Sequence, residues 1–396
     1  MVTRPGDAPQ QPDLPDRAED AAEDAAIEQR AAGLLRDPRR LAILFLGFIA
    51  VVVAIYVLLP MVVGLGDTVD RLGDAVWYWI LVALAFNVAA FAAYVALFRG
   101  VLAGTDDAKM ERRLDFSASY QITMAGLAAT RVFSAAGAGG LVLTYWALRK
   151  AGLARRRAAC RMVAFLVLLY TVYLLALVVF GVLLRTDVLP GKDPVSATVV
   201  PAAIAAGVLL FLGCVALIPG DIERRLAGLA KGRRRAVWAG RLATGPATLA
   251  TGVRTAIGYI RHPRRGALAI AGAIGFWAAN IGVLWASFEA FGGDVPFGVL
   301  VQGFFVGMAA NLIPSPAGGV GSVDAGMIGA FVLFGIPAAS VVFPAVLTYR
   351  VIAFWLPIPP GIIAFFQLQR TVAAWADEDR RAPYPSESKV TVGETR

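Results

Sequence analysis

Long stretches without a charged residue constrain this chain more than any other feature. Such stretches of 19 residues or more cover Leu41–Leu59, Ala75–Phe98, Met162–Leu184, Val195–Gly220 and Gly266–Phe288. A helix needs about 20 consecutive apolar residues to cross the hydrocarbon core of a bilayer. We therefore predict an all-α polytopic membrane protein. This class excludes a soluble enzyme, a nucleic-acid-binding domain and a membrane β-barrel, whose strands would appear as short alternating segments.

Charge and cysteine content narrow the class further. Only 16% of the residues are Asp, Glu, Lys or Arg, and the net charge is +9. In a membrane protein this excess of basic residues belongs in the cytoplasmic loops, so it does not indicate a nucleic-acid partner. Cys160, Cys214 and the single histidine, His262, offer neither a disulfide framework nor a metal-ligand set. We expect no metal, no cofactor and no catalytic residue.

Basic residues also predict the orientation of the chain. Arg36, Arg39 and Arg40 immediately precede the first expected span, from Leu41 to about Pro60, and basic flanks stay in the cytoplasm. No apolar core lies near Met1, so we expect no cleaved signal peptide. The following spans then alternate, and both termini are expected in the cytoplasm. We expect the protein in the cytoplasmic membrane of a prokaryote.

Composition divides the chain into a membrane domain and two tails. The first tail is rich in Pro, Asp, Glu and Ala and is expected to be disordered. The membrane domain contains a strongly basic cytoplasmic loop, which either holds anionic lipid headgroups or only determines topology. The expected boundaries are 1–37 for the first tail, 38–370 for the membrane domain, 221–265 for the basic loop and 371–396 for a second disordered tail.

Two further apolar blocks are interrupted by glycine and proline. The first, Phe116–Leu148, is flanked by basic residues at both ends and breaks near Gly137–Gly140. Its two arms of about 15 residues reach only about 22 Å, which suits a re-entrant hairpin better than two spans. The second, Val295–Pro337, breaks between Pro314 and Gly321. Together with the long stretches they predict about six full transmembrane helices and two re-entrant hairpins.

The two broken blocks look like copies of one another. Aligning Gly137-Ala138-Gly139-Gly140 with Gly318-Gly319-Val320-Gly321 gives an offset of 181 residues. By the charge argument, the first hairpin enters from the cytoplasm and the second from outside. Opposite orientation of related units is typical of inverted-repeat transporters, whose substrate site lies where broken helices meet near mid-membrane.

Three charged residues stand inside the apolar blocks: Arg131, Asp324 and Arg350. An arginine at the centre of a transmembrane helix costs at least about 2.5–3.5 kcal/mol, so such residues are functional candidates by default. In one interpretation, Arg131 and Arg350 line a polar cavity and bind an anionic group, for which guanidinium geometry is well suited. In the other, Asp324 and Arg350 form a buried ion pair that locks the second repeat. Either way, the two should lie within salt-bridge distance.

The segment Asn311–Asp324 is the most specific string in the chain. Its prolines remove backbone donors and break the helix. Its glycines let the backbone approach a ligand, and exposed N–H groups here could hold an anion. The alternative is a kinked packing motif of small residues.

This string resembles the second motif of the lysylphosphatidylglycerol synthase transmembrane-region family, described as flippase-like. The resemblance continues through Gly335-Ile336-Pro337 and Leu347-Thr348-Tyr349-Arg350, and the first block, Gly137–Leu153, is similar to an earlier glycine-rich element. The usual glutamate of the second motif is Asp324 here, and a glutamate common in the first is absent, with Leu141 nearest. Members with aminoacyl-transferase activity carry a large soluble domain, for which the tail after Gln367 is too short.

Together, the patterns and the resemblance imply a set of substrate-binding candidates. They are Arg131, Gly137, Gly139, Gly140, Asn311, Pro314, Ser315, Pro316, Gly318, Gly319, Gly321, Asp324, Tyr349 and Arg350.

Two functions from different classes fit these observations. The first is a flippase or transporter of an anionic lipid or a lipid-linked precursor. The second is a non-transporting membrane scaffold that recruits a separate glycosyl- or aminoacyl-transferase. An intramembrane enzyme lacks a nucleophile–base set. The expected partners are anionic membrane lipids, with a homo-oligomer or a separate transferase as further possibilities, and no nucleic acid.

Overall fold

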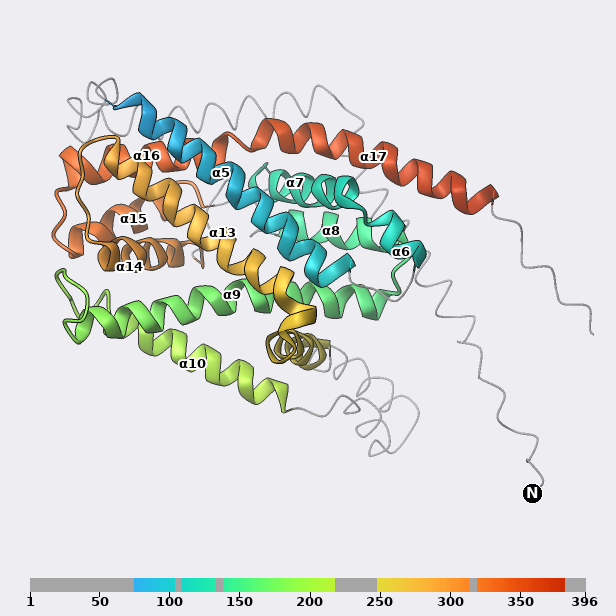
Figure 1. The fold of residues 1–396 in the computed structure, drawn as a ribbon, viewed down its shortest axis with the longest axis horizontal. Coiled ribbons are helices and arrows are strands. Elements are labelled where there is room, and N and C mark those ends of the chain that lie inside the picture. Colours follow the sequence, from blue (N-terminus) through green and yellow to red (C-terminus); the bar gives the residue numbers. More distant parts are fainter. Residues whose placement is uncertain (1–74, 104–107, 133–137, 218–247, 313–318, 382–396) are drawn as a thin grey trace, which may run out of the picture. The chain divides into compact units, whose positions relative to one another are not determined.

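The computed structural model of the chain describes residues 75–103, 108–132, 138–217, 248–312 and 319–381. These ranges fall within one compact unit, Leu59–Arg396, and their regular secondary structure is helical (Figure 1). The expected first tail, the first span and residues 218–247 of the basic loop lie outside the described residues. The rest of that loop is not simply a loop, because residues 248–261 are helical and α13 begins at Pro263.

Five segments of the described chain are long and apolar enough to cross a membrane. The first four are α5 (Trp77–Phe98), α9 (Arg155–Arg185), α10 (Val199–Ala216) and α13 (Pro263–Glu289). The fifth lies within Ser340–Arg381, the last apolar segment, whose final residues from Asp377 onward are charged. They correspond to the spans expected after the first one, and the prediction of an all-α polytopic membrane protein is confirmed.

The two interrupted blocks form pairs of short helices packed on each other. Helices α7 (Phe116–Val132) and α8 (Ala138–Ala151) form hairpin 1. Helices α14 (Phe297–Met308) and α15 (Ser322–Leu333) form hairpin 2, with the 3₁₀ turn η4 (Ala309–Leu312) ending α14. A helix of 12 residues, such as α14 or α15, is about 18 Å long, well short of the roughly 30 Å hydrocarbon core.

In each hairpin the two helices approach each other closely at a pair of glycines. A Cβ on Gly140 would collide with the carbonyl oxygen of Gly126, and a Cβ on Gly326 would lie 2.8 Å from the carbonyl oxygen of Gly307. Gly126 and Gly307 are 181 positions apart, the same offset that aligns the two glycine-rich breaks. The shared glycine contact therefore supports the interpretation of the hairpins as copies.

The last apolar segment is broken rather than continuous. It consists of η5 (Ala338–Val342), α16 (Phe343–Arg350), η6 (Val351–Trp355) and α17 (Ile358–Arg381), where η5 and η6 are π-helical. The break before α17 coincides with Pro357, Pro359 and Pro360, which have no N–H group to donate.

The boundary expected for the second tail is wrong. Helix α17 continues to Arg381, so residues 371–381 are helical, while 382–396 lie outside the described residues. Ala373, Ala374 and Ala376 are strong helix formers. The side chain of Trp375 is buried against the rest of the molecule, which fixes this extension.

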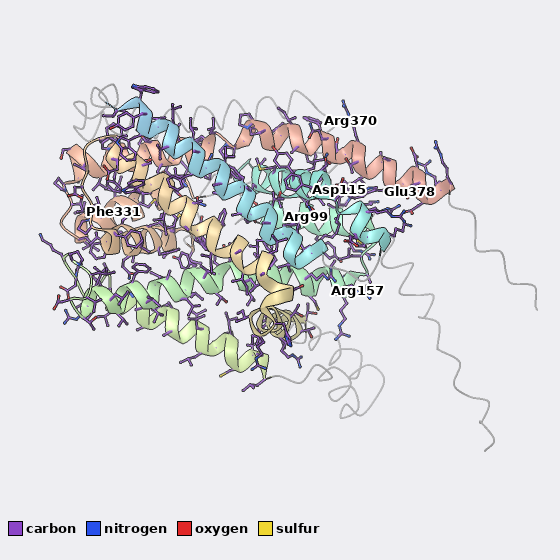
Figure 2. All side chains as sticks on the ribbon, viewed as in Figure 1. Arg99, Asp115, Arg157, Phe331, Arg370 and Glu378 are labelled. Atoms are coloured by element: carbon purple, nitrogen blue, oxygen red, sulfur yellow. The ribbon has the colours of Figure 1, made fainter. Side chains whose placement is uncertain are left out.

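The core elements pack through small residues and aromatic edges. Helix α5 lies along α13, where a Cβ on Gly272 would collide with the backbone of Leu97. Helix α9 packs against α10 and α14, and α17 runs along α7 (Figure 1). In Figure 2, the labelled Arg157 and Glu378 lie toward one end of these helices, and Phe331 of hairpin 2 lies toward the other.

Candidate functional site

Arg350 and Asp324 form a buried ion pair that ties α16 to hairpin 2. Arg350 Nε lies 2.7 Å from Asp324 Oδ1, and the side chains are 5% and 13% exposed. Arg350 Nη2 also donates a hydrogen bond to the carbonyl oxygen of Gly319 at 3.1 Å. The predicted salt bridge is confirmed. An unpaired buried charge would be costly, so the presence of each of these two residues explains why the other is tolerated in an apolar segment.

The same carboxylate caps the first turn of α15. The backbone N–H of Gly321 donates to Asp324 Oδ2 at 2.9 Å, and a negative charge is favourable at a helix N-terminus. Gly319 and Gly321 have φ angles of +93° and +84°, which glycine adopts without the strain of a side chain. The turn thus presents the Gly319 carbonyl and the Asp324 carboxylate to the guanidinium of Arg350.

Arg131, at the end of α7, is held by backbone carbonyls instead of a carboxylate. Its Nη1 donates to the carbonyl oxygen of Phe354 at 2.9 Å, and its Nη2 donates to that of Ala353 at 3.0 Å. Asn87 of α5 donates to the neighbouring carbonyl of Ile352 at 3.0 Å. Side chains from α5 and α7 therefore donate hydrogen bonds to three successive backbone carbonyls of η6.

The prolines of the last segment explain why these carbonyls are available. In an α-helix the carbonyl of Ala353 would accept from residue 357, and in a π-helix the carbonyl of Phe354 would accept from residue 359. Pro357 and Pro359 have no N–H, so neither bond can form. A buried carbonyl without a donor is costly in a membrane, and the arginine supplies the missing donors.

Phe354 brings the two arginines together. The guanidinium carbon of Arg131 lies 5.1 Å from the centre of the Phe354 ring, and that of Arg350 lies 4.3 Å from it. Both distances fall in the range of cation–π contacts. Both hairpins therefore direct polar groups to a single position beside the proline break. That these groups line an open cavity stays a prediction.

The other sequence candidates are placed around this position or lie outside the described residues. Tyr349 is buried, and its hydroxyl donates a long hydrogen bond of 3.5 Å to Asn280 Oδ1 of α13. Asn311 is exposed at the end of η4, with its amide oxygen beside Gly319. Gly139 and Gly140 lie in the first turn of α8. The candidates outside the described residues are Gly137, Pro314, Ser315, Pro316 and Gly318.

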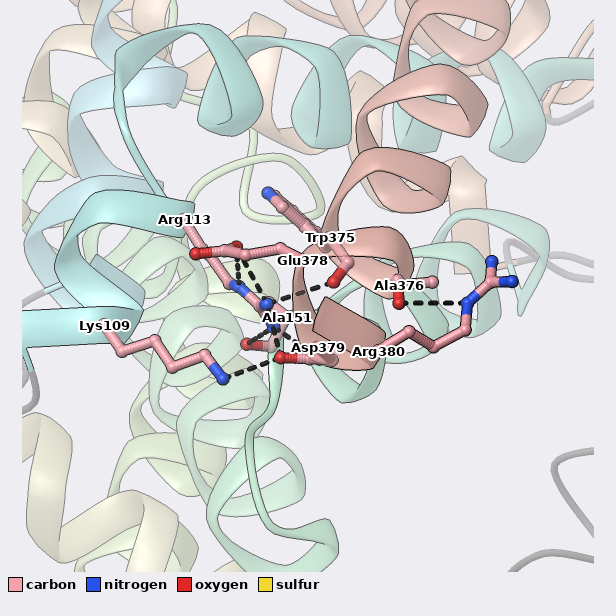
Figure 3. A network of polar contacts seen from close by, with 8 residues as sticks. All are labelled: Lys109, Arg113, Ala151, Trp375, Ala376, Glu378, Asp379 and Arg380. Carbon is pink, nitrogen blue, oxygen red and sulfur yellow. Dashed lines mark hydrogen bonds and ion pairs between the residues drawn. The ribbon is translucent and has the colours of Figure 1, made fainter. Parts of the chain in front are cut away.

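A second polar cluster, which the sequence interpretation did not identify, lies at the base of hairpin 1 (Figure 3). Arg113, at the end of α6 (Ala108–Arg113), is 5% exposed. Its Nη2 donates to the Trp375 carbonyl at 3.1 Å, to Glu378 Oε2 at 3.0 Å and to Asp379 Oδ1 at 2.7 Å. Nη1 reaches the Ala151 carbonyl at 3.5 Å. One guanidinium thus joins both ends of hairpin 1 to α17.

The carboxylate of Asp379 is shared between two basic residues. Lys109 Nζ lies 2.7 Å from Asp379 Oδ1, on the same side chain that accepts from Arg113. The hydrogen bonds from Arg113 and then Lys109 lower the pKa of Asp379 from 3.8 to about 2. This part of α17 follows the apolar stretch and carries Asp377, Glu378 and Asp379 in succession, so it lies beyond the membrane core.

Within the described ranges, no three His, Cys, Asp or Glu side chains are placed to hold a metal ion. Among protein families, the one described as "Lysylphosphatidylglycerol synthase TM region" matches residues 29–361. No curated protein and no solved structure matches the chain. The matched range contains both hairpins, the Asp324–Arg350 pair and the proline break, and it ends before most of α17.

Proposed function

This chain belongs to the lysylphosphatidylglycerol synthase transmembrane-region family, and we propose that it is a transporter that moves an anionic lipid or a lipid-linked precursor across the membrane. The family supports the coarser statement, a multi-pass membrane protein related to lipid modification or flipping. Transport, the cytoplasmic membrane as its location, and the absence of a catalytic step are parts of the proposal.

The observation that carries the proposal is the meeting of Arg131 and Arg350 at Phe354. With Asp324 as the acid that pairs with Arg350, the three side chains sum to one positive charge. Burying a net positive charge in a membrane domain costs free energy unless an anion binds beside it. An anionic phosphate group is such an anion, and it accepts several hydrogen bonds from guanidinium groups.

Both arginines have N–H donors left for a ligand. A guanidinium has five N–H donors, and the hydrogen bonds described above use two on Arg131 and one on Arg350, whose Nε also faces Asp324 in the ion pair. The acceptors of Arg131 are neutral carbonyls, which make weaker hydrogen bonds than a charged phosphate oxygen does. A headgroup phosphate can therefore compete for Arg131 with the protein's own backbone.

The test is headgroup-labelled lipid translocation in proteoliposomes that contain the purified protein. We expect the wild type to move an anionic lipid, and Arg131→Ala to lose at least about tenfold of the initial rate, which corresponds to about 1.4 kcal/mol of barrier. Arg350→Ala is combined with Asp324→Ala, because the single substitution leaves a carboxylate buried and unpaired. Arg370→Ala, at an exposed position of α17, is the matched control.

The outcomes separate the two functional classes. Translocation by the wild type and the control, but not by a folded Arg131→Ala variant, supports the transporter. Full activity in folded Arg131→Ala removes the anion site from the proposal. A wild type that moves no lipid, yet copurifies with a transferase through its cytoplasmic face, would replace the transporter by the scaffold.

A further inference from the structure

Each half of the last apolar segment is fastened to a different hairpin. The first half, α16, is tied to hairpin 2 by the Arg350–Asp324 ion pair and by the hydrogen bond to the Gly319 carbonyl. Tyr349 adds a contact to Asn280 of α13. Helix α16 also packs against α13 and α15. The first half therefore belongs with hairpin 2 and α13.

The second half, α17, is fastened to hairpin 1 along its whole length. Near the break, Gly361 approaches α7 so closely that a Cβ would lie 2.6 Å from Ala128 Cβ. Further along, the Thr371 hydroxyl donates to Gln121 Oε1 at 2.8 Å. At the far end, Arg113 holds the Trp375 carbonyl and the Glu378 carboxylate. Contacts at three levels leave little freedom for α17 to slide or tilt relative to hairpin 1.

The junction between the halves lacks the hydrogen bonds that stiffen a helix. Because of the prolines, the carbonyls of Ala353 and Phe354 are held by Arg131 rather than by the next turn. The bond from the Leu356 N–H to the Val351 carbonyl, at 2.9 Å, ends the first half. Sharp bends in helices occur at such prolines, because a proline donates no hydrogen bond to the preceding turn.

We propose that hairpin 1 and α17 move together as one rigid body, which rotates about Leu356–Pro357 relative to α16 and hairpin 2. The hydrogen bonds of Arg131 hold the two bodies together until a ligand binds. In the structure these hydrogen bonds are formed, since Arg131 on the moving body donates to the carbonyls of η6 on the other body. When a headgroup phosphate binds the guanidinium of Arg131, the hydrogen bonds to these carbonyls break and the moving body can rotate. The rotation separates Arg131 from Arg350 and opens the site. The inference rests on the proposed function for its ligand, whereas the two bodies and the hinge are inferred from the contacts and from the prolines at the junction.

Distances between spin labels in vesicles test the motion. In a Cys160→Ala/Cys214→Ala background, cysteines replace exposed residues: Tyr120 of α7, Ile363 of α17, Val332 of α15 and Ile274 of α13. The pairs 120–363 and 332–274 lie within one body each, and 332–363 joins the two. The vesicles are phosphatidylcholine, with or without phosphatidylglycerol as the anionic probe.

We expect the pairs within a body to keep one narrow distance distribution in both vesicles. The pair between bodies should broaden, and phosphatidylglycerol should shift it by more than the width of the within-body distributions. A 120–363 distance that shifts as much as the 332–363 distance would overturn the rigid body. A 332–363 distance that stays fixed in vesicles where lipid is translocated would overturn the hinge. Movement without any lipid translocation would keep the hinge and remove the proposed function.

A proline substitution tests the hinge independently. Pro357→Ala restores a donor for the Ala353 carbonyl, so it should straighten the junction and narrow the 332–363 distribution in both vesicles. Pro344→Ala is the matched control, because Pro344 is also a helix proline but lies within the first half, thirteen positions before Pro357 and away from the junction. An unchanged 332–363 distribution in folded Pro357→Ala would overturn the hinge at this position. If Pro357→Ala does not fold, the wild-type distances decide alone.

Discussion

Hairpin 2 meets the arginine of the last span with its own carboxylate, whereas hairpin 1 carries an arginine and finds its acceptors in the backbone of another element. Asp324 neutralises Arg350 by charge. Arg131 is met by the dipoles of two carbonyl groups and by the face of the Phe354 ring, and by no carboxylate among the contacts described. The first arrangement is balanced without a ligand. The second keeps its full positive charge.

The difference indicates that the two hairpins hold their arginines in different ways. A balanced pair holds α15, α16 and the glycine turn in place, while an arginine held by dipoles stays available to a stronger acceptor.

Breaking the ion pair should have the largest effect and should separate the hairpins most clearly. Asp324→Ala leaves Arg350 buried and unpaired, so we expect a loss of about 3–5 kcal/mol of stability. Arg131→Ala leaves two neutral carbonyls without donors and should cost about 2 kcal/mol. Unfolding of the purified variants in mixed micelles with increasing denaturing detergent measures both losses.

The double variant Asp324→Ala/Arg350→Ala is the control for coupling. It should be more stable than Asp324→Ala alone, because no unpaired charge remains. Asp324→Glu keeps the charge and places a favoured residue at the third position of α15, so it should stay close to the wild type. Equal losses for the single and double variants would contradict the pairing.

The cluster at the base of hairpin 1 should have the next largest effect. Arg113→Ala removes charge-assisted hydrogen bonds from a buried position, at a cost of about 2–3 kcal/mol. Arg380→Ala is the control, because Arg380 pairs with Asp377 at an exposed position, where such a pair contributes at most about 0.5 kcal/mol. Protease sensitivity of α17, compared between the two variants, reports whether the helix detaches. Equal sensitivity would contradict the fastening of α17 to hairpin 1.

A glycine-to-alanine substitution should have opposite signs in the two hairpins. Gly140→Ala places a methyl group against Thr130 and the backbone of Gly126, and we expect a loss of about 1–3 kcal/mol from overpacking. Gly329→Ala, in α15, meets nothing within 4 Å and should gain up to about 1 kcal/mol through helix propensity. Thermal stability in detergent distinguishes them, and a Gly140→Ala variant as stable as the wild type would refute the close contact of α7 with α8.

The smallest effect concerns pH and only the cluster that contains Asp379. Since the pKa of this carboxyl is lowered to about 2 in the folded protein, its stabilising contribution is complete above its ordinary value of 3.8 and disappears as the pH falls through 2. The difference in stability between the wild type and Asp379→Asn should therefore be constant from pH 7 to pH 5 and shrink below pH 4. A difference that stays constant down to pH 3 would contradict this role of Asp379.

The membrane class, the two broken hairpins and the Asp324–Arg350 pair were accessible from the sequence. Each depends on side-chain chemistry that the sequence records directly. A charge-free stretch can only be a span, and two opposite charges in neighbouring apolar segments are costly unless they meet. The same argument failed for Arg131, because its partners are carbonyls, which every residue has. The available signal was the missing donors of Pro357 and Pro359.

The helix beyond Gln367 was missed for a different reason. A polar segment after the last span is interpreted as a tail when its charges are counted, and its pairing with Arg113 depends on a contact across 265 positions. Trp375, a large aromatic residue amid polar residues, was the available signal for burial, since it packs under the Arg113 guanidinium, whose carbon lies 6.0 Å from its ring centre.

The long separation between Arg113 and its partners also sets the order in which the protein can be completed during synthesis. Arg113 and Arg131 emerge from the ribosome early, but Glu378 follows 265 residues after the first, and Phe354 follows 223 residues after the second. At roughly 5–20 residues per second, this delay is on the order of tens of seconds. Hairpin 1 is therefore inserted among the first elements and finished last, and until η6 and α17 are synthesised Arg131 and the neighbouring Arg113 need other acceptors, such as lipid phosphates.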